Sequence, residues 1–306
     1  MARRKKGRSI HGWLVLDKPV GMTSTQAVGA VRRAFDARKA GHAGTLDPLA
    51  TGILPIALGE ATKTVPYAVE GQKSYRFTVR WGVQTDTDDA EGRAVKTSDM
   101  RPDRAAIEAV LGDFTGEIEQ VPPRYSALKV DGARAYELAR DDEDFELAAR
   151  RVAIDSLTLI DHPDPDHCVL ETHCGKGTYV RALARDLGRA LGALGHVEQL
   201  RRTRVGPFGE ERAITLSALE ALAEGGHEAL LTALLPVETA LCDIPVLAIA
   251  GPDADRLRRG QPVLLRGRDA PIVQGTVYAT SRGTLVAVGE VSRGELKPKR
   301  IFNLPR

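Results

Sequence analysis

The segment GHAGTLDPLATG, residues 41–52, places one carboxylate, that of Asp47, among small and apolar residues. Pro48 pushes Asp47 away from helical dihedral angles and into an extended or turn geometry. Gly41 and Gly44 permit another chain to approach this backbone closely. An aspartate with apolar neighbours must be paired, or its pKa rises. The segment therefore predicts a loop whose carboxylate does chemistry, although an ordinary Asp-Pro turn fits the same residues.

A second informative residue is Arg181, in the first turn of a helix predicted to begin near Thr178. The apolar residues that indicate this helix recur at helical spacing: Val180, Leu183, Ala184, Leu187 and Leu191. A cation in the first turn opposes the helix dipole by about 0.3–1 kcal/mol, so we expect a buried carboxylate to compensate it. Arg185 and Arg189 extend the pattern into a stripe on one face, which also fits a solvated basic surface.

Composition limits the class of protein. The 306 residues include 43 Lys+Arg and 41 Asp+Glu, and 42% are hydrophobic, which excludes global disorder and suggests about two domains. No apolar run approaches the ~18 residues that a membrane helix needs. The basic start lacks a small-residue cleavage site, which argues against a secretory signal. Three cysteines make no disulfide framework, so a reducing cytoplasm is expected.

The distribution of charged residues and of short β-rich runs divides the chain into three parts. Residues 1–8 hold five basic side chains and no acid, and residues 251–306 hold eleven basic and five acidic ones. Basic ends suggest a polyanion partner, although a solvated tail and an ordinary basic domain also fit. We predict a disordered tail over 1–9, a main domain over 10–243 and a small β-rich domain over 244–306. Alternating strands and helices in the main domain, such as the half-buried strand 73–82, indicate a mixed α/β fold.

Cofactor and metal motifs are missing from the sequence. It contains no Walker-type phosphate loop and no dinucleotide-binding glycine pattern. The acidic run 86–91 imitates a calcium loop, but Ala90 and Glu91 stand where a ligand and a glycine are required, so we predict a solvated acidic turn. Cys168 and Cys174 are six residues apart in a predicted strand, roughly 20 Å, which is too far for one zinc ion. Buried strand cysteines are the better interpretation.

Six ordered blocks over roughly residues 10–215 together resemble the TruB family of bacterial tRNA pseudouridine-55 synthases. The blocks are LDKPxGMTS (16–24), GHxGTLDPLATG (41–52), KSY (73–75) with GxxTDTxD (82–89), PxYSALK (123–129), GKGTYVR (175–181) and HVxxLRR (196–202). Six blocks in order are far more specific than any single motif. The C-terminal piece resembles the family's RNA-binding PUA-type domain, with weaker motifs.

The resemblance implies an enzyme that isomerises uridine 55 in the T-loop of tRNA after flipping the base out of the loop. It implies catalytic roles for Asp47 as nucleophile, Tyr75 as the residue that stacks on the base, and Arg181 as the partner of Asp47. Attack on the ribose and attack on the base both remain open. For the substrate, it implies that His42 fills the vacated space, that Tyr179 lines the uridine pocket and that Leu200 closes it. A plain structural role also fits each of these residues.

The family fold implied is a mixed α/β catalytic domain on a largely antiparallel sheet, with a cleft along its middle and a PUA-like C-terminal domain. The implied partner is the T-arm of tRNA, for a cytoplasmic monomer with no cofactor, metal, membrane or protein partner. Lys18 would support the site, and Lys129, Arg201 and Arg202 would contact phosphates. The alternative function is a tRNA-folding chaperone that binds and remodels the T-arm.

Overall fold

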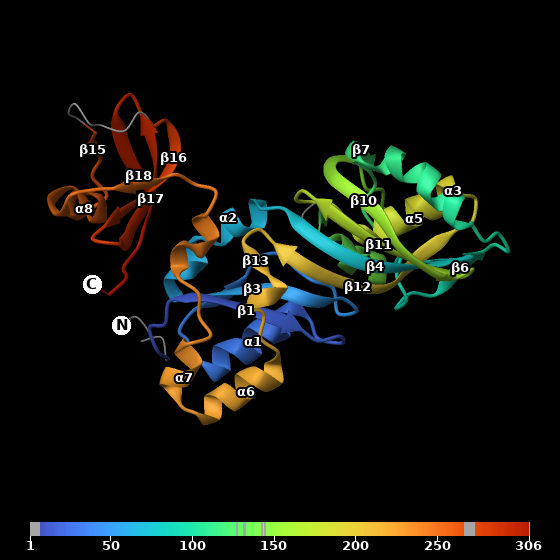
Figure 1. Cartoon of the computed structure of the whole chain (residues 1–306), viewed down its shortest axis with the longest axis horizontal. Helices are drawn as coiled ribbons and strands as arrows, with labels where there is room; N and C mark the ends of the chain where they lie inside the picture. The colour runs from blue at the N-terminus through green and yellow to red at the C-terminus, as the bar shows by residue number, and fades with distance from the viewer. Residues whose placement is uncertain are drawn as a thin grey trace.

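The computed structural model describes residues 7–126, 128–130, 133–141, 143, 145–265 and 273–305. These residues form a large nine-stranded sheet, a separate five-stranded sheet and two short hairpins (Figure 1). The large sheet has the order β1-β3-β12-β4-β11-β10-β7, with β2 beside β3 and β13 beside β12. Its strands are β1 (Gly12–Lys18), β2 (Ala40–His42), β3 (Thr51–Leu58), β4 (Lys73–Trp81), β7 (Gly116–Gln120), β10 (Arg150–Asp164), β11 (His167–Cys174), β12 (Gly195–Val205) and β13 (Phe208–Gly209).

Strand pairing in the large sheet is antiparallel except between β3 and β12, which run parallel. This bears out the prediction of a mixed α/β fold with a largely antiparallel sheet. Strand β4 shows why the sheet forms, because Phe77, Val79 and Trp81 alternate with polar residues and are buried. Tyr75 lies on the same face, and its register partners are Thr172 on β11 and Arg202 on β12.

Cys168 and Cys174 are buried on β11, as the sequence predicted. Two short hairpins lie off the sheet, β5 (Val83–Thr85) with β6 (Ala94–Thr97), and β8 (Lys129–Val130) with β9 (Ala133–Arg134). The acidic run 86–91 therefore forms the connection between β5 and β6.

Helix α5 (Val180–Ala190) packs on β12 and β4, and nearly every residue along it is buried. It begins two residues later than predicted. Its N-cap, Tyr179, has no capping side chain of its own, and Gln120 instead accepts from the Tyr179 N–H at 2.8 Å and donates to its carbonyl at 3.1 Å. The other α-helices are α1 (Ser24–Ala34), α2 (Val65–Glu70), α3 (Arg104–Val110), α4 (Ala135–Arg140), α6 (Leu216–Glu224), α7 (His227–Leu231) and α8 (Gly251–Arg258). The 3-10 helices are η1 (Gly59–Lys63), η2 (Leu111–Phe114), η3 (Glu210–Arg212) and η4 (Val237–Leu241).

The five-stranded sheet stands at one end of the molecule (Figure 1). Its order is β14-β16-β17-β18-β15, with strands β14 (Val246–Ala248), β15 (Val263–Leu264), β16 (Gly275–Ser281), β17 (Thr284–Ser292) and β18 (Glu295–Ile301). This fits the small β-rich, PUA-like domain expected there, and the division at residue 243 stays a prediction. The sheet joins the main body through apolar packing, because Phe302 and Leu285 belong to one buried cluster with Trp13 and Phe208.

The N-terminal residues that the structure describes are fixed. Arg8 donates its backbone N–H to the Asp36 carbonyl and accepts one from Arg38, so order begins earlier than residue 10. Residues 1–6 of the predicted tail lie outside the described residues. Among the described helices, none is both long enough and apolar enough to cross a membrane.

Candidate active site

The loop that carries Asp47 connects β2 to β3, and side chains from three other elements fix its backbone. Lys18, at the end of β1, donates to the Pro48 carbonyl at 3.3 Å. Ser24, at the start of α1, accepts from the Leu46 N–H at 2.8 Å and donates to the Leu46 carbonyl at 3.0 Å. Arg202 on β12 donates to the carbonyls of residues 44 and 45 at 3.1 and 3.2 Å. The residues on both sides of Asp47 are therefore held in place before any substrate binds.

Lys18 is completely buried, and all three of its N–H donors point at carbonyls. Besides Pro48, it donates to the carbonyls of Pro19 and Met22, each at 2.8 Å. Burial lowers the pKa of Lys18 to about 8, and the nearby charge of Asp47 opposes this shift. Lys18 thus supports the loop from behind, as the sequence predicted.

Arg181 and Asp47 form the ion pair that the family resemblance implied, with Nε 3.0 Å from Oδ2. The Arg181 side chain is only 6% exposed, whereas that of Asp47 is 40% exposed. The guanidinium is fixed by further bonds, from Nη1 to the Thr87 carbonyl and from Nη2 to the Tyr125 carbonyl, both 2.9 Å. The carboxylate is therefore aligned by a rigid cation and still open to solvent or to a ligand.

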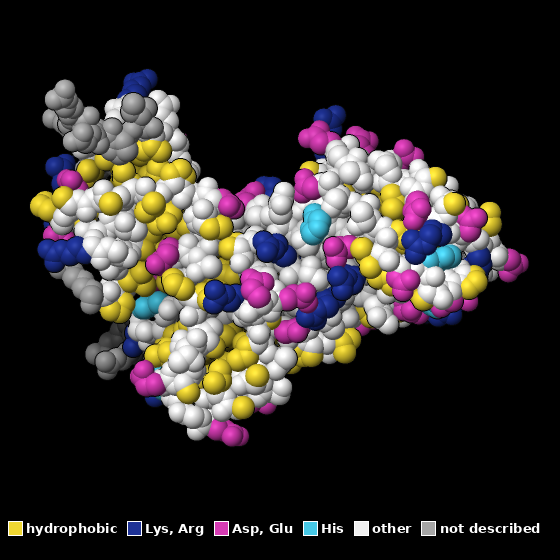
Figure 2. Space-filling view, viewed as in Figure 1, with side chains coloured by type: hydrophobic (Ala, Val, Ile, Leu, Met, Phe, Trp, Pro, Cys, Tyr) yellow, Lys and Arg dark blue, Asp and Glu magenta, His cyan; other side chains and the backbone are white. Residues whose placement is uncertain are grey.

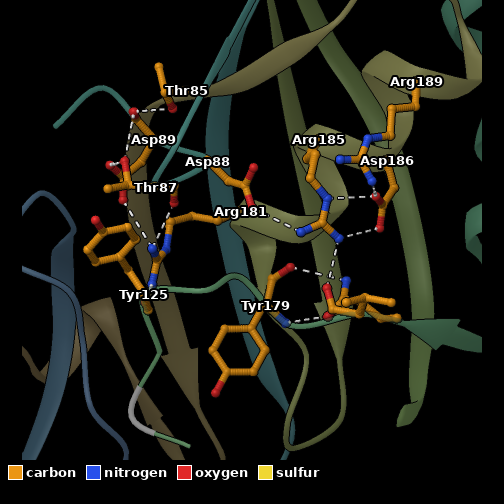
Figure 3. A network of polar contacts seen from close by, with 12 residues as sticks. Thr85, Thr87, Asp88, Asp89, Tyr125, Tyr179, Arg181, Arg185, Asp186 and Arg189 are labelled. Carbon is orange, nitrogen blue, oxygen red and sulfur yellow. Dashed lines mark hydrogen bonds and ion pairs between the residues drawn. The ribbon is translucent and has the colours of Figure 1, made fainter. Parts of the chain in front are cut away.

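A second carboxylate compensates Arg181 on its buried side (Figure 3). Asp89 Oδ2 lies 3.4 Å from Arg181 Nη1, and the Asp89 side chain is only 4% exposed. Asp89 Oδ1 accepts from the Thr87 hydroxyl at 2.6 Å and from the Glu91 N–H at 3.1 Å. Because a buried cation needs such a partner, Asp89 would keep Arg181 in place even when Asp47 leaves the pair.

Arg185, one helical turn further on, repeats this arrangement and is also buried (Figure 3). Its Nη1 lies 3.0 Å from Asp88 Oδ2, and its Nε donates to Asp186 at 2.8 Å. Nη2 also donates to the Val121 carbonyl at 2.7 Å. Burial raises the pKa of Asp88, and the charge of Arg185 opposes that shift. The stripe predicted on α5 is therefore two buried arginines followed by Arg189, whose side chain is 54% exposed.

The predicted acidic turn is wrong for Asp88 and Asp89, which are both buried. Residues 86–91 show no apolar pattern that would predict the burial of these carboxylates. Their arginine partners lie more than 90 residues away in the sequence. Two carboxylates, those of Asp47 and Asp89, compensate the charge of Arg181. The sequence did not identify Asp89 as one of them.

A cavity of about 640 Å³ opens beside this ion pair, a volume typical of small-molecule sites. Five of the six predicted site residues line it: Asp47, Tyr75, Tyr179, Arg181 and Leu200. Burial raises the pKa of both tyrosine hydroxyls, so each is a neutral phenol at pH 7. The arrangement offers the accessible carboxylate of Asp47, the Arg181 cation that holds it, and aromatic and apolar walls that suit a flat ring.

His42 does not line the cavity. It lies at the end of β2, five residues before Asp47, where it is half-buried. Burial and the charge of Arg202 lower the pKa of His42, so its imidazole is neutral at pH 7. A neutral ring beside the loop that carries Asp47 suits stacking better than it suits a phosphate contact.

Two family profiles match this chain. A family profile described as TruB family pseudouridylate synthase (N terminal domain) matches residues 32–180, and one described as tRNA pseudouridylate synthase B C-terminal domain matches residues 181–242. A protein of Bradyrhizobium diazoefficiens named tRNA pseudouridine synthase B is 64% identical over 304 residues, which cover 98% of this chain and 88% of that protein.

The chain belongs to the TruB family of pseudouridylate synthases. A TruB relative of the same name from Caulobacter sp. is 57% identical over 99% of this chain and all of that protein. Solved structures share the fold of this TruB-family chain. A chain in the crystal structure of a Cbf5-Nop10-Gar1 complex has a TM-score of 0.75 and 27% identity, over 95% of this chain and 84% of that one. A chain in the structure of an H/ACA RNP bound to a substrate RNA containing 2′-deoxyuridine has a TM-score of 0.75 and 25% identity. The match covers 100% of this chain and 92% of that one.

Of the phosphate contacts predicted for this TruB-family chain, the one assigned to Arg202 needs correction. Arg202 is 1% exposed and bonded to three carbonyls, so it cannot reach a phosphate. Arg201 pairs with Asp17 through two bonds of 3.0 Å and with Glu210 at 2.6 Å, and its side chain is 36% exposed, so its phosphate contact stays a prediction. The Lys129 side chain lies outside the described residues. The alternation along β12 could have identified Arg202, because it shares the face of buried Leu200 two residues before it.

Proposed function

We propose that this enzyme isomerises uridine 55 in the T-loop of tRNA to pseudouridine, with Asp47 as the nucleophile. The observation that carries the proposal is the Asp47–Arg181 pair. It presents an accessible carboxylate, fixed by a buried cation, at the wall of a cavity large enough for a nucleotide. The relatives' printed name supports tRNA as the substrate.

The reaction balances without a redox partner. The N1–C1′ bond breaks, the base turns, and a C5–C1′ bond forms, while C5 loses its proton and N1 ends with one. A carboxylate that forms a covalent intermediate divides this difficult exchange into two easier steps. Attack of Asp47 on C1′ and attack on the base are both compatible with its exposure. Arg181 holds the Asp47 carboxylate in place, with its Nε 3.0 Å from Asp47 Oδ2.

The other predicted residues take roles around a flipped uracil. Tyr75 stacks on the base from β4, and Tyr179 and Leu200 form the remaining walls. A base that is flipped out of a folded loop leaves a gap, and flipping costs a few kcal/mol. The neutral ring of His42 fills that gap and recovers part of this cost by stacking.

The C-terminal domain, residues 244–306, provides a second contact with RNA. Its exposed cations include Arg282 and Arg293, each at the tip of a hairpin of the five-stranded sheet. Figure 2 shows a hollow between this domain and the body of the large sheet, with cations and acids interspersed along the visible face. Because the RNA contacts are shared between two domains, RNA binding needs no single continuous basic surface. We place the enzyme in the cytoplasm as a monomer.

The alternative function, a tRNA-folding chaperone, predicts binding without chemistry. The test uses tRNA transcript with tritium at C5 of uridine, an isolated T-arm and an unrelated RNA hairpin. Tritium release from tRNA and T-arm, mapped to position 55 by chemical labelling of pseudouridine, is expected. Binding of tRNA without any release would overturn the proposal in favour of the chaperone.

A further inference from the structure

The buried guanidinium of Arg202 differs from those of Arg181 and Arg185 in the polar groups that surround it. Its side chain lies in the wall of the cavity, and the residue is 1% exposed. Within the described parts of the chain, no carboxylate lies within ion-pair distance of its guanidinium, whereas Arg181 and Arg185 each have two. A buried charge is energetically unfavourable unless polar groups surround it, so other polar groups must compensate the charge of Arg202.

Three backbone carbonyls replace the missing carboxylate. Nε donates to Ile53 at 2.8 Å, Nη1 to Thr45 at 3.2 Å and Nη2 to Gly44 at 3.1 Å. Ile53 lies on β3 just after the catalytic loop, and the other two lie just before Asp47. The planar fork of the guanidinium therefore bridges both ends of the loop, which a lysine ammonium on its flexible stem cannot do with the same geometry.

Backbone pairing places Arg202 between the two halves of the site. In β12 it pairs with Tyr75 on β4 and with Gly52 on β3. Gly52 has φ +96°, and a Cβ there would lie 2.2 Å from the Arg202 carbonyl oxygen, so the two backbones meet where only glycine fits. Any displacement of Arg202 would be transmitted directly to the Asp47 loop and to the Tyr75 strand.

We propose that Arg202 is a positioning residue that sets the Asp47 carboxylate in its reactive place by fastening the 44–53 loop to β12. This inference rests on the proposed function, because it assumes that Asp47 is the nucleophile. Arg202 pairs in register with Tyr75, and burial raises the pKa of the Tyr75 hydroxyl while the charge of Arg202 opposes that shift. Arg202 itself touches neither base nor phosphate in this account.

The test separates positioning from RNA binding by comparing Arg202→Lys and Arg202→Met. Single-turnover tritium release at saturating tRNA reports chemistry, and filter binding reports the Kd. We expect Arg202→Met to lose about 10- to 100-fold in rate with an unchanged Kd, since a displacement of ~1 Å at a catalytic group costs on that scale. Arg202→Lys keeps the charge and some of the bonds, so it should restore part of the rate.

The matched control is Arg76→Gln. Arg76 follows Tyr75 on β4 but faces the other side of the sheet, where it pairs with Glu171 at 3.0 Å. This variant should keep the wild-type rate. A second variant, Gly44→Ala, disturbs the same contact from the loop and leaves Arg202 intact. Because Gly44 has φ +89°, an alanine there is strained and must shift the carbonyl that Arg202 holds. It should lose rate with an unchanged Kd, and it decides the question if Arg202→Met does not fold.

Two results would overturn the inference. Wild-type rates in Arg202→Met, or in Gly44→Ala where Arg202→Met does not fold, would show that the loop needs no fastening. A weakened Kd with an intact rate at saturation would show that Arg202 acts on RNA binding. Failure of the proposed function is distinguishable, because the wild-type enzyme itself would then release no tritium.

Discussion

Arg181 Nε lies 3.0 Å from Asp47 Oδ2, and the two side chains differ sharply in exposure, 6% against 40%. The cation is fixed by the protein interior, while the carboxylate faces the cavity. An ion pair built in this way aligns the Asp47 carboxylate without enclosing it. The same asymmetry predicts that removing Arg181 costs stability, whereas removing the charge of Asp47 costs mainly chemistry.

Arg181→Met should destabilise the protein by about 3–5 kcal/mol, because it leaves Asp89 buried without a cation. Urea unfolding followed by circular dichroism measures the change. Arg189→Met, on the same helix but 54% exposed, is the matched control and should shift the free energy of unfolding by no more than about 0.5 kcal/mol. Equal effects for the two variants would contradict the role of Arg181 as a compensated buried cation.

Turnover should decline as pH rises through 8, because the pKa of Lys18 is lowered to about 8 and its deprotonation removes a donor from the loop carbonyls. The free energy of unfolding changes with pH in the opposite direction and rises over the range in which turnover falls. The unfolded chain holds this proton up to about pH 10.5, so the cost of burying the ammonium is complete below pH 8 and is relieved between pH 8 and 10.5.

The measurement is single-turnover tritium release at saturating tRNA from pH 7 to 9.5. Lys18→Met should be slower and lack this decline. An identical midpoint in that variant would assign the titration to another group.

Neutralising four exposed cations of the C-terminal sheet should weaken tRNA binding: Arg282, Arg293, Lys297 and Arg300. Each lost phosphate contact should lower the slope of log K against log[salt] by about 0.7–0.9, while the rate at saturating RNA stays unchanged. Glutamine substitutions suit this test better than deleting the domain, because deletion would uncover the apolar cluster around Trp13 and Phe302.

Filter binding over a range of salt concentrations gives the slope for the wild type and for the neutralised variant. Arg104→Gln on α3, where Arg104 pairs with Glu108 at 3.1 Å, serves as the control. An unchanged slope in the four-residue variant would remove this domain from the RNA contact.

Local chemistry made some of the site predictable. Asp47 stands out because a carboxylate lies among apolar neighbours before a proline, and Arg181 because a cation opposes its helix dipole. Strand alternation likewise gave the face of Tyr75. Asp89 could not be found in this way, because its burial depends on Arg181, distant in sequence and supplied by α5.

The order of strands in the large sheet was also beyond local patterns, since β3 meets β12 only through long-range pairing. That pairing is what turns Arg202 from an expected surface cation into a buried one. The C-terminal sheet was recognisable from its short β-rich runs, but its apolar attachment to the body was not.

The most direct test of the account compares wild type with Asp47→Asn in single-turnover tritium release, with tRNA affinity measured alongside. The substitution preserves shape and, because Asp89 still pairs with Arg181, should preserve the fold. We predict release at uridine 55 by the wild type, none by Asp47→Asn, and the same Kd for both. Normal release by Asp47→Asn would contradict the central claim that Asp47 is the nucleophile.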